Sequence, residues 1–127
     1  MIVRALLAGL PALVLMAGAA SAQTAAAGDA SAGEKVFNQC KACHTVEAGK
    51  NRVGPSLHGV VGRKAGTVEG FNYSQPMKDS GMTWTPENLD KYLADPKATI
   101  PGNKMAFAGL KSPQDRANVI AYLSQQK

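Results

Sequence analysis

Residues 39–45 read QCKACHT, and this stretch holds the only two cysteines of the chain, Cys40 and Cys43. His44 directly follows the second cysteine, so two thiols and an imidazole lie within five residues. Thiols act as nucleophiles and metal ligands, and imidazole is a common metal ligand. This segment therefore indicates the chemistry of the protein more directly than any other part of the chain.

The spacing C-x-x-C-H can be interpreted in four ways. A structural disulfide would close a loop too small to constrain much of the unfolded chain. A thioredoxin-like redox pair needs a β-α-β context, and no strand pattern precedes Cys40. A zinc site could combine this segment with His58, the only other histidine. Its spacing does not match a zinc finger, and the adjacent Cys43 and His44 would be strained around one tetrahedral ion.

The fourth interpretation is the attachment signature of a c-type haem. Each thiol would add to one vinyl group of the porphyrin, and the two residues between the cysteines set the reach across the ring edge. His44 could then turn its imidazole onto the iron. We favour this interpretation because one short segment anchors the ring and supplies an axial ligand.

The N-terminus has the pattern of a secretory signal peptide. Arg4 precedes an uncharged run at residues 5–20, and residues 20–22 (ASA) fit a signal peptidase site. The alternative is an uncleaved membrane anchor, but the run is shorter than the roughly 20 residues that a span needs, and Pro11 interrupts it. We predict cleavage after Ala22 and a periplasmic protein, consistent with haem attachment outside the cytoplasm.

The remaining chain is predicted to form a flexible segment at residues 23–28 and one domain at residues 29–127. Loss of the signal peptide lowers the formal charge from +5 to +4. This excess suits an acidic partner surface better than a nucleic acid, since no dense Lys/Arg run is present. With three Phe, three Tyr and one Trp, the domain has few large side chains for a core. We expect that something other than protein fills part of the interior.

The periodicity predicts an all-α domain with three main helices and much loop. The first helix opens at Asp29 or at Ser31, where SAGE is a capping box, and carries the cysteines at its C-terminal end. Residues 45–82 are rich in glycine and predict loops and short turns. The second helix starts at Thr85-Pro86 and is ended by Asp95-Pro96, and the third runs from Ser112-Pro113 to about Gln126.

A haem held by His44 alone would leave one iron position open. His58 is a candidate for it, but it follows His44 closely and is expected to be an ordinary surface histidine. Each of the three methionines after the predicted cleavage site, Met77, Met82 and Met105, could simply be core filler. Met105 is favoured because Pro101-Gly102 frees the backbone to aim its side chain, and 61 positions separate it from His44.

The chain resembles the class I c-type cytochromes, specifically the cytochrome c2 group of bacteria and its mitochondrial relatives. The similarity spans residues 33–123 and is carried by the stretches CKACHTVEAG, GPSLHGVVGRKAG, GFNYS, MTWTPENLDKYLADPKATIPGNKMAFAGL and RANVIAYL. It implies the cytochrome c fold, in which three main helices and long loops wrap around one covalent haem c. It also implies that Cys40 and Cys43 form the thioethers, that His44 and Met105 are the axial ligands, and that the carbonyl of Pro55 receives the other imidazole N–H.

The resemblance assigns five further residues to the haem surroundings. Arg63, Tyr73 and Trp84 match groups that hold a buried propionate. Tyr92 matches the tyrosine beside the ligand sulfur, and Phe107 the aromatic along the haem edge. It further implies that Gly33 and Phe37 form the face of the first helix that packs on the last one.

Two positions depart from the family pattern. Met77 stands where the family often has an asparagine, which would remove an amide from the propionate network. Asn103 replaces a threonine and is expected to keep a polar group near the propionate.

A His/Met-ligated haem has no vacant site for a substrate, so the expected function is electron transfer, with no enzymatic activity. The resemblance implies a soluble, monomeric shuttle between a cytochrome bc1-type donor and an oxidase, a photosynthetic reaction centre or a periplasmic reductase. Acidic docking faces on these partners would meet basic residues expected around the haem edge: Lys41, Lys50, Arg52, Lys97, Lys104 and Lys111. The alternatives are a membrane-tethered carrier with an uncleaved N-terminus, and a haem enzyme or gas sensor with an open iron site.

Overall fold

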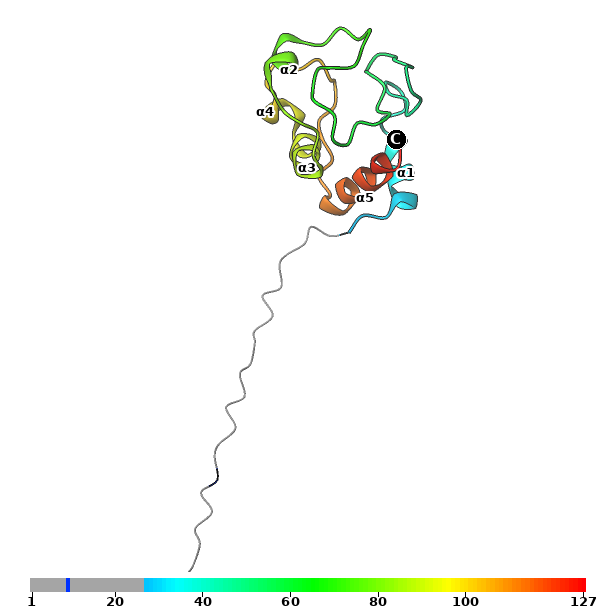
Figure 1. The fold of residues 1–127 in the computed structure, drawn as a ribbon, viewed down its shortest axis with the longest axis vertical. Coiled ribbons are helices and arrows are strands. Elements are labelled where there is room, and N and C mark those ends of the chain that lie inside the picture. Colours follow the sequence, from blue (N-terminus) through cyan, green and yellow to red (C-terminus); the bar gives the residue numbers. More distant parts are fainter. Residues whose placement is uncertain (1–8, 10–26) are drawn as a thin grey trace, which may run out of the picture.

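The computed structural model of the chain describes residue 9 and residues 27–127. The predicted signal peptide (1–22, apart from residue 9) and residues 23–26 of the predicted flexible segment lie outside the described residues. Within the described part, the regular elements are five helices, and an isolated bridge between Lys64 and Thr83 is the one β interaction (Figure 1). The predicted all-α class is therefore confirmed. None of the helices described is both long and apolar enough to traverse a bilayer.

Helix α1 (Ala30–Phe37) begins at Asp29, whose carboxylate accepts hydrogen bonds from the backbone N–H groups of Ser31 and Ala32. The predicted capping box led by Ser31 is wrong, because Ser31 lies inside the first turn. The helix also ends at Phe37, so both cysteines follow it instead of forming its C-terminal end. Hydrogen-bonded turns continue the chain from there, and the backbone N–H of His44 donates to the carbonyl of Cys40 (2.9 Å).

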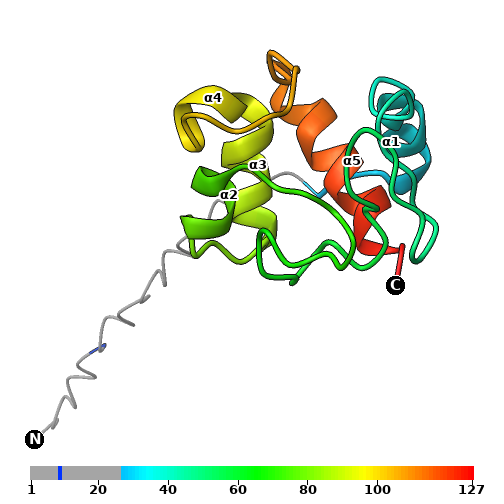
Figure 2. The same cartoon turned by 90° about the horizontal axis from the view of Figure 1, so that it is seen from above.

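Helix α5 (Pro113–Ser124) starts at the predicted Ser112 cap and ends two residues before the predicted Gln126. It packs on α1 more extensively than any other helix pair does, and Figure 2 shows the two helices side by side. Gly33 makes this close approach possible, because a Cβ there would collide with the backbone carbonyl of Asn118. Phe37 and Tyr122 also meet across the interface, with ring centroids 5.4 Å apart.

Helices α2 (Gln75–Asp79), α3 (Pro86–Ala94) and α4 (Pro96–Thr99) lie on the other side of the molecule (Figure 2). The Thr85 hydroxyl caps α3 as predicted, accepting from the backbone N–H of Asn88 (3.2 Å). Asp95 ends α3, but it also caps α4 by accepting from Ala98 N–H (3.1 Å). The short helices α2 and α4 lie where the sequence predicts loops or a helix end. Each has a polar cap followed closely by a proline.

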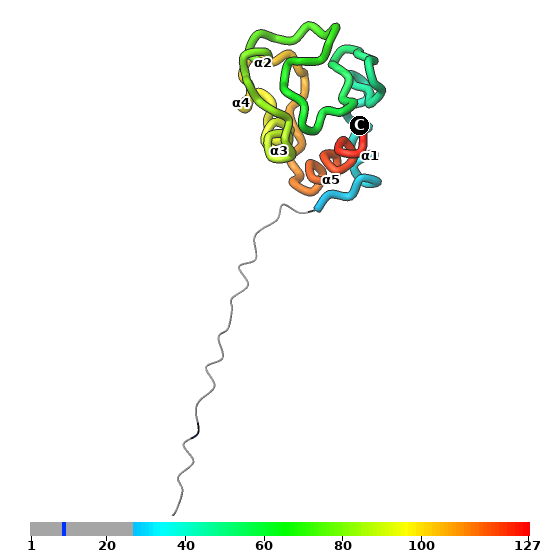
Figure 3. Tube along the Cα trace, in the orientation of Figure 1, coloured from blue at the N-terminus to red at the C-terminus, as the bar shows by residue number. Residues whose placement is uncertain are grey.

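Long irregular connections join the two groups of helices. The connection between α1 and α2 forms a large part of the upper molecule in Figure 3, and that between α4 and α5 passes through its middle. Buried side chains from both the helices and the connections form one core, which includes Phe37, Val60, Trp84, Tyr92 and Val119. The connections are therefore packed parts of the fold and can hold side chains in fixed positions.

Candidate haem site

A mostly apolar cavity of about 270 Å³ lies between the two groups of helices. Protein interiors contain few voids larger than a water molecule, so a hollow of this size indicates a site for a large apolar group. All ten predicted site residues line it: Cys40, Cys43, His44, Pro55, Arg63, Tyr73, Trp84, Tyr92, Met105 and Phe107. They come from segments far apart in the sequence, from Cys40 to Phe107, that only the fold brings together.

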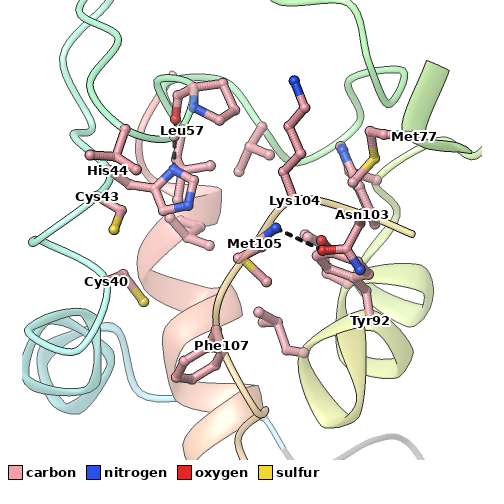
Figure 4. A pocket seen from close by; sticks show the side chains of 18 of the residues that line it. Cys40, Cys43, His44, Leu57, Met77, Tyr92, Asn103, Lys104, Met105 and Phe107 are labelled. Atoms are coloured by element: carbon pink, nitrogen blue, oxygen red, sulfur yellow. Dashed lines mark hydrogen bonds between the residues drawn. The ribbon is translucent and has the colours of Figure 1, made fainter. Parts of the chain in front are cut away.

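The imidazole of His44 is held by the connection that follows it. Its Nδ1 donates a hydrogen bond to the carbonyl of Pro55 (2.7 Å), as Figure 4 shows. Burial is the main reason that the pKa of His44 lies below its usual value, and the nearby charge of Arg63 lowers this pKa further. A neutral ring with its proton on Nδ1 leaves the Nε2 lone pair available to a metal.

Gly54 is a site residue that the sequence reasoning missed. The His44 ring lies against its Cα, and a Cβ there would fall 2.7 Å from Nδ1 and 2.9 Å from Nε2 of the ring, and closer still to Cε1. The backbone N–H of Gly54 donates to the carbonyl of Cys43 (2.8 Å), which keeps the glycine beside the ring. A glycine directly before the proline that holds the histidine was the available signal.

Both cysteines are free thiols in this structure, so the disulfide interpretation finds no support. Burial raises the pKa of the Cys40 thiol, and the neighbouring Cys43 raises it further. Figure 4 shows both sulfur atoms on the same side of the cavity as His44. This placement suits attachment of a ring edge next to the imidazole.

Met105 reaches the cavity from the connection between α4 and α5. Residues 103–108 alternate between half-buried and exposed, which is the pattern of an extended segment with one face inward. Met105 and Phe107 lie on the inward face, and Figure 4 shows the Met105 side chain in the cavity. Among the other ligand candidates, Met77 also lines the cavity and His58 does not. The Nδ1 of His58 instead forms a hydrogen bond with the carbonyl of Val46 (3.1 Å).

The structure bears on two expectations for lesser residues, and the one for His58 is wrong. His58 is half-buried instead of a surface residue, and its own carbonyl accepts a hydrogen bond from Arg63 (3.1 Å). The side-chain amide of Asn103 directs both N–H groups to backbone carbonyls, those of Pro96 and Ile100. These hydrogens are therefore committed to the protein and not free for a propionate.

Arg63 supplies a specific test of whether the cavity fits a haem. Its Nη1 donates to the carbonyls of Ser56 (3.0 Å) and His58 (3.1 Å). Its Nε is buried and has no hydrogen-bond partner among the described residues. Buried N–H groups almost always have an acceptor, so this atom indicates that an acceptor, such as a carboxylate, belongs in the cavity. Tyr73 and Trp84 line the same cavity.

The residues present therefore fit a covalently held haem: two thiols beside a neutral imidazole, a thioether, apolar walls, and an arginine whose buried Nε lacks an acceptor. The zinc interpretation fares worse, because no group of three or more His, Cys, Asp or Glu side chains in the described chain is arranged to hold a metal ion. The individual roles of the ten residues toward the haem stay predictions.

Comparisons with known proteins agree with this fit. Residues 30–127 match the cytochrome c family. Cytochrome c2 iso-2 of Magnetospirillum fulvum is 69% identical over 87 residues, which cover 68% of this chain and 91% of that protein. Cytochrome c2 of Rhodomicrobium vannielii is 57% identical over 117 residues, 89% of this chain and 94% of the relative.

A solved structure, cytochrome cH from Methylobacterium extorquens, superposes with a TM-score of 0.74 at 52% identity and covers 76% of this chain and 98% of its own. The predicted cytochrome c fold and haem c are thereby confirmed. The chain belongs to the cytochrome c family, as a class I c-type cytochrome of the cytochrome c2 group that binds haem c covalently.

Proposed function

We propose that the chain is a periplasmic shuttle that carries single electrons from a cytochrome bc1-type donor to an oxidase, a photosynthetic reaction centre or a periplasmic reductase. The observation that carries the proposal is that His44 and Met105, 61 positions apart, both line the cavity that the two cysteines border. The names of the cytochrome c2 relatives support the same function. We further propose that residues 1–22 are removed, that the carrier is soluble, and that it has no enzymatic activity.

When bound, the haem supplies a one-electron Fe(III)/Fe(II) couple. The residues of the chain set the conditions under which that couple works. Pro55 fixes the tautomer and orientation of His44, while the soft thioether of Met105 and the apolar walls favour the reduced, less charged iron. Because packed segments hold both ligands, little structural change should accompany gain or loss of the electron.

Basic side chains give a means of partner selection. Lys41, Lys50, Arg52, Lys97, Lys104 and Lys111 are all exposed. Lys104 lines the cavity, as does Val53, the neighbour of Arg52, and Arg52 bonds the carbonyl of Lys41 (3.3 Å). Positive charge near the cavity would steer the carrier to acidic docking faces and make association fast and salt-sensitive.

The test is a reduced-minus-oxidised visible spectrum with and without carbon monoxide. We expect haem bands that resist extraction by acid acetone, a weak far-red band from a sulfur–ferric iron bond, and no ready binding of carbon monoxide at neutral pH. Met105→Ala should keep the covalent haem, lose the far-red band and bind carbon monoxide. Ready binding by the unaltered protein would instead support an open-site enzyme or sensor. Survival of the far-red band in the variant would reassign the ligand to another methionine.

The proposed removal of residues 1–22 is tested by a separate experiment. Sequencing the N-terminus of the protein purified from cells should give a start at Gln23. A start at Met1 would replace the soluble shuttle by a membrane-tethered carrier.

A further inference from the structure

The side chain of Asn103 makes three hydrogen bonds to three different backbone groups. Its Nδ2 donates to the carbonyls of Pro96 (2.9 Å) and Ile100 (2.8 Å), and its Oδ1 accepts from the backbone N–H of Met105 (2.9 Å). Figure 4 shows the last of these bonds. The partners define which end of the amide is which, because two carbonyls require donors and an N–H requires an acceptor. The side chain therefore joins both ends of helix α4 to the predicted iron ligand.

The backbone of the segment around Met105 makes few other hydrogen bonds. None of residues 104–109 makes a backbone–backbone hydrogen bond. The next one downstream joins Leu110 N–H to the carbonyl of Leu93 (2.7 Å). Upstream, Gly102 has φ of +83°, so the turn before Asn103 does not extend the helix. Two exposed lysine side chains also make hydrogen bonds here, Lys104 Nζ to the carbonyl of Asn72 (3.1 Å) and Lys111 Nζ to that of Ala108 (3.4 Å). The backbone itself is fastened at Leu110 and at Asn103, and Met105 is two residues from the second point.

We propose that Asn103 is a positioning residue that keeps the Met105 thioether on the iron by anchoring its backbone to α4. The proposal rests on the proposed function, in which Met105 is the distal ligand. It differs from the role expected for this position from the sequence, a polar group facing the propionate, because both amide N–H groups are used by α4. Without Asn103, the segment should leave the iron more often while the rest of the fold stays formed.

The experiment measures how fast imidazole displaces Met105 from the ferric holoprotein in stopped flow. Displacement by a saturating ligand is limited by departure of the methionine, so its plateau rate reports opening of the segment. Each lost hydrogen bond contributes modestly, and for Asn103→Ala we expect a plateau rate about 10- to 100-fold above that of the unaltered protein. Asn103→Ser should give a smaller increase, since a hydroxyl can still accept from the N–H two residues on.

Thr99→Ala is the matched control. The Thr99 hydroxyl also bonds backbone carbonyls around α4, those of Lys91 (3.1 Å) and Asp95 (2.8 Å), but none near Met105. We expect its plateau rate to stay within about twofold of the unaltered protein. Hydrogen exchange of the Met105 amide is a second readout: it should be slow in the unaltered protein and in Thr99→Ala, and fast in Asn103→Ala.

The outcomes separate the two proposals. An unaltered protein that lacks the far-red band and binds imidazole without a rate plateau would overturn the proposed function. A normal unaltered protein with equal rates for Asn103→Ala and Thr99→Ala would leave the function standing and overturn the role of Asn103. If Asn103→Ala does not assemble with haem, an unchanged rate in Asn103→Ser would overturn the same role.

Discussion

Replacing Gly54 by alanine tests the contact that holds the His44 ring. The new Cβ would lie 2.7 Å from Nδ1, whereas ordinary contact begins near 3.4 Å, so the ring or the backbone must move by about 0.7 Å at this atom. The His44 ring cannot turn away freely, because its Nδ1–H is hydrogen-bonded to the carbonyl of Pro55, the residue after Gly54. The backbone cannot retreat freely either, because the Gly54 N–H is bonded to the carbonyl of Cys43.

The expected cost follows from these contacts. Overpacking costs about 1–3 kcal/mol, and weakening the His44–Pro55 hydrogen bond adds about 1 kcal/mol. Gly54 does not have a positive φ, so alanine brings no backbone strain and recovers about 0.4–1 kcal/mol from the stiffer unfolded chain. The net loss is about 1–4 kcal/mol in the free energy of unfolding, equivalent to a fall in Tm of roughly 5–25 °C for a domain of this size.

The assay is thermal unfolding of the ferric holoprotein together with its reduction potential. A weaker bond to Pro55 makes His44 a less basic ligand, which disfavours ferric iron, so the potential should rise in Gly54→Ala. Gly59→Ala is the control: Gly59 has φ of +66° and open space around its Cβ position, so alanine costs about 1–2 kcal/mol through backbone strain alone and should leave the potential unchanged. The reasoning is refuted if Gly54→Ala assembles with unchanged Tm and potential.

Two further predictions use other walls of the cavity. Arg63→Leu should lower the reduction potential in a potentiometric titration, because a half-buried cation at the cavity favours the less charged ferrous state. The variant should also lose about 1–3 kcal/mol of stability, since two carbonyls are left unpaired. A reduction potential that is unchanged or higher would contradict this prediction. Burial raises the pKa of Tyr92 from 10.0 to about 12. Between these pH values the folded state therefore keeps a proton that the unfolded state loses. As a result, the unaltered protein should lose about 2–3 kcal/mol of stability between pH 10 and 12. Denaturant unfolding at both pH values should show a smaller loss in Tyr92→Phe, and equal losses would disprove the assignment.

The sequence predicted best where a local pattern determines the local structure. Thr85-Pro86 and Ser112-Pro113 each combine a side-chain cap with a proline suited to the first turn, and both helices begin there. Helix α2 was missed although Ser74 and Pro76 form a similar signal. Five residues are too few to produce a periodic apolar pattern, so the cap alone could have revealed it.

The position of Asp29 shows a different limit. Both Asp29 and Ser31 are good caps, and SAGE also satisfies the capping-box pattern. The choice is made by tertiary structure: the backbone N–H of Asp29 donates to the side chain of Asn118 on α5 (2.9 Å). This contact spans 89 positions, and no local pattern contains it.

The site could be predicted from motifs only as a set of residues. The resemblance placed ten residues in one site, and all ten line one cavity. Apart from the Pro55 carbonyl, which the resemblance paired with His44, it could not supply the way that backbone groups hold these residues, because a carbonyl or an N–H leaves no trace in residue identity. The contact of Gly54 with His44 and the three bonds of Asn103 are of this kind.

Both predicted ligands lie outside the helices, and hydrogen bonds to other parts of the chain explain how irregular segments can hold a metal ligand firmly. His44 is fastened by a carbonyl and confined by a glycine on the connection that follows it. Met105 is fastened through a side chain that returns to a short helix. Because separate segments provide the two attachments, loss of one should leave the other intact. Gly54→Ala should therefore change the potential without speeding imidazole binding, and Asn103→Ala should speed imidazole binding while His44 stays bound.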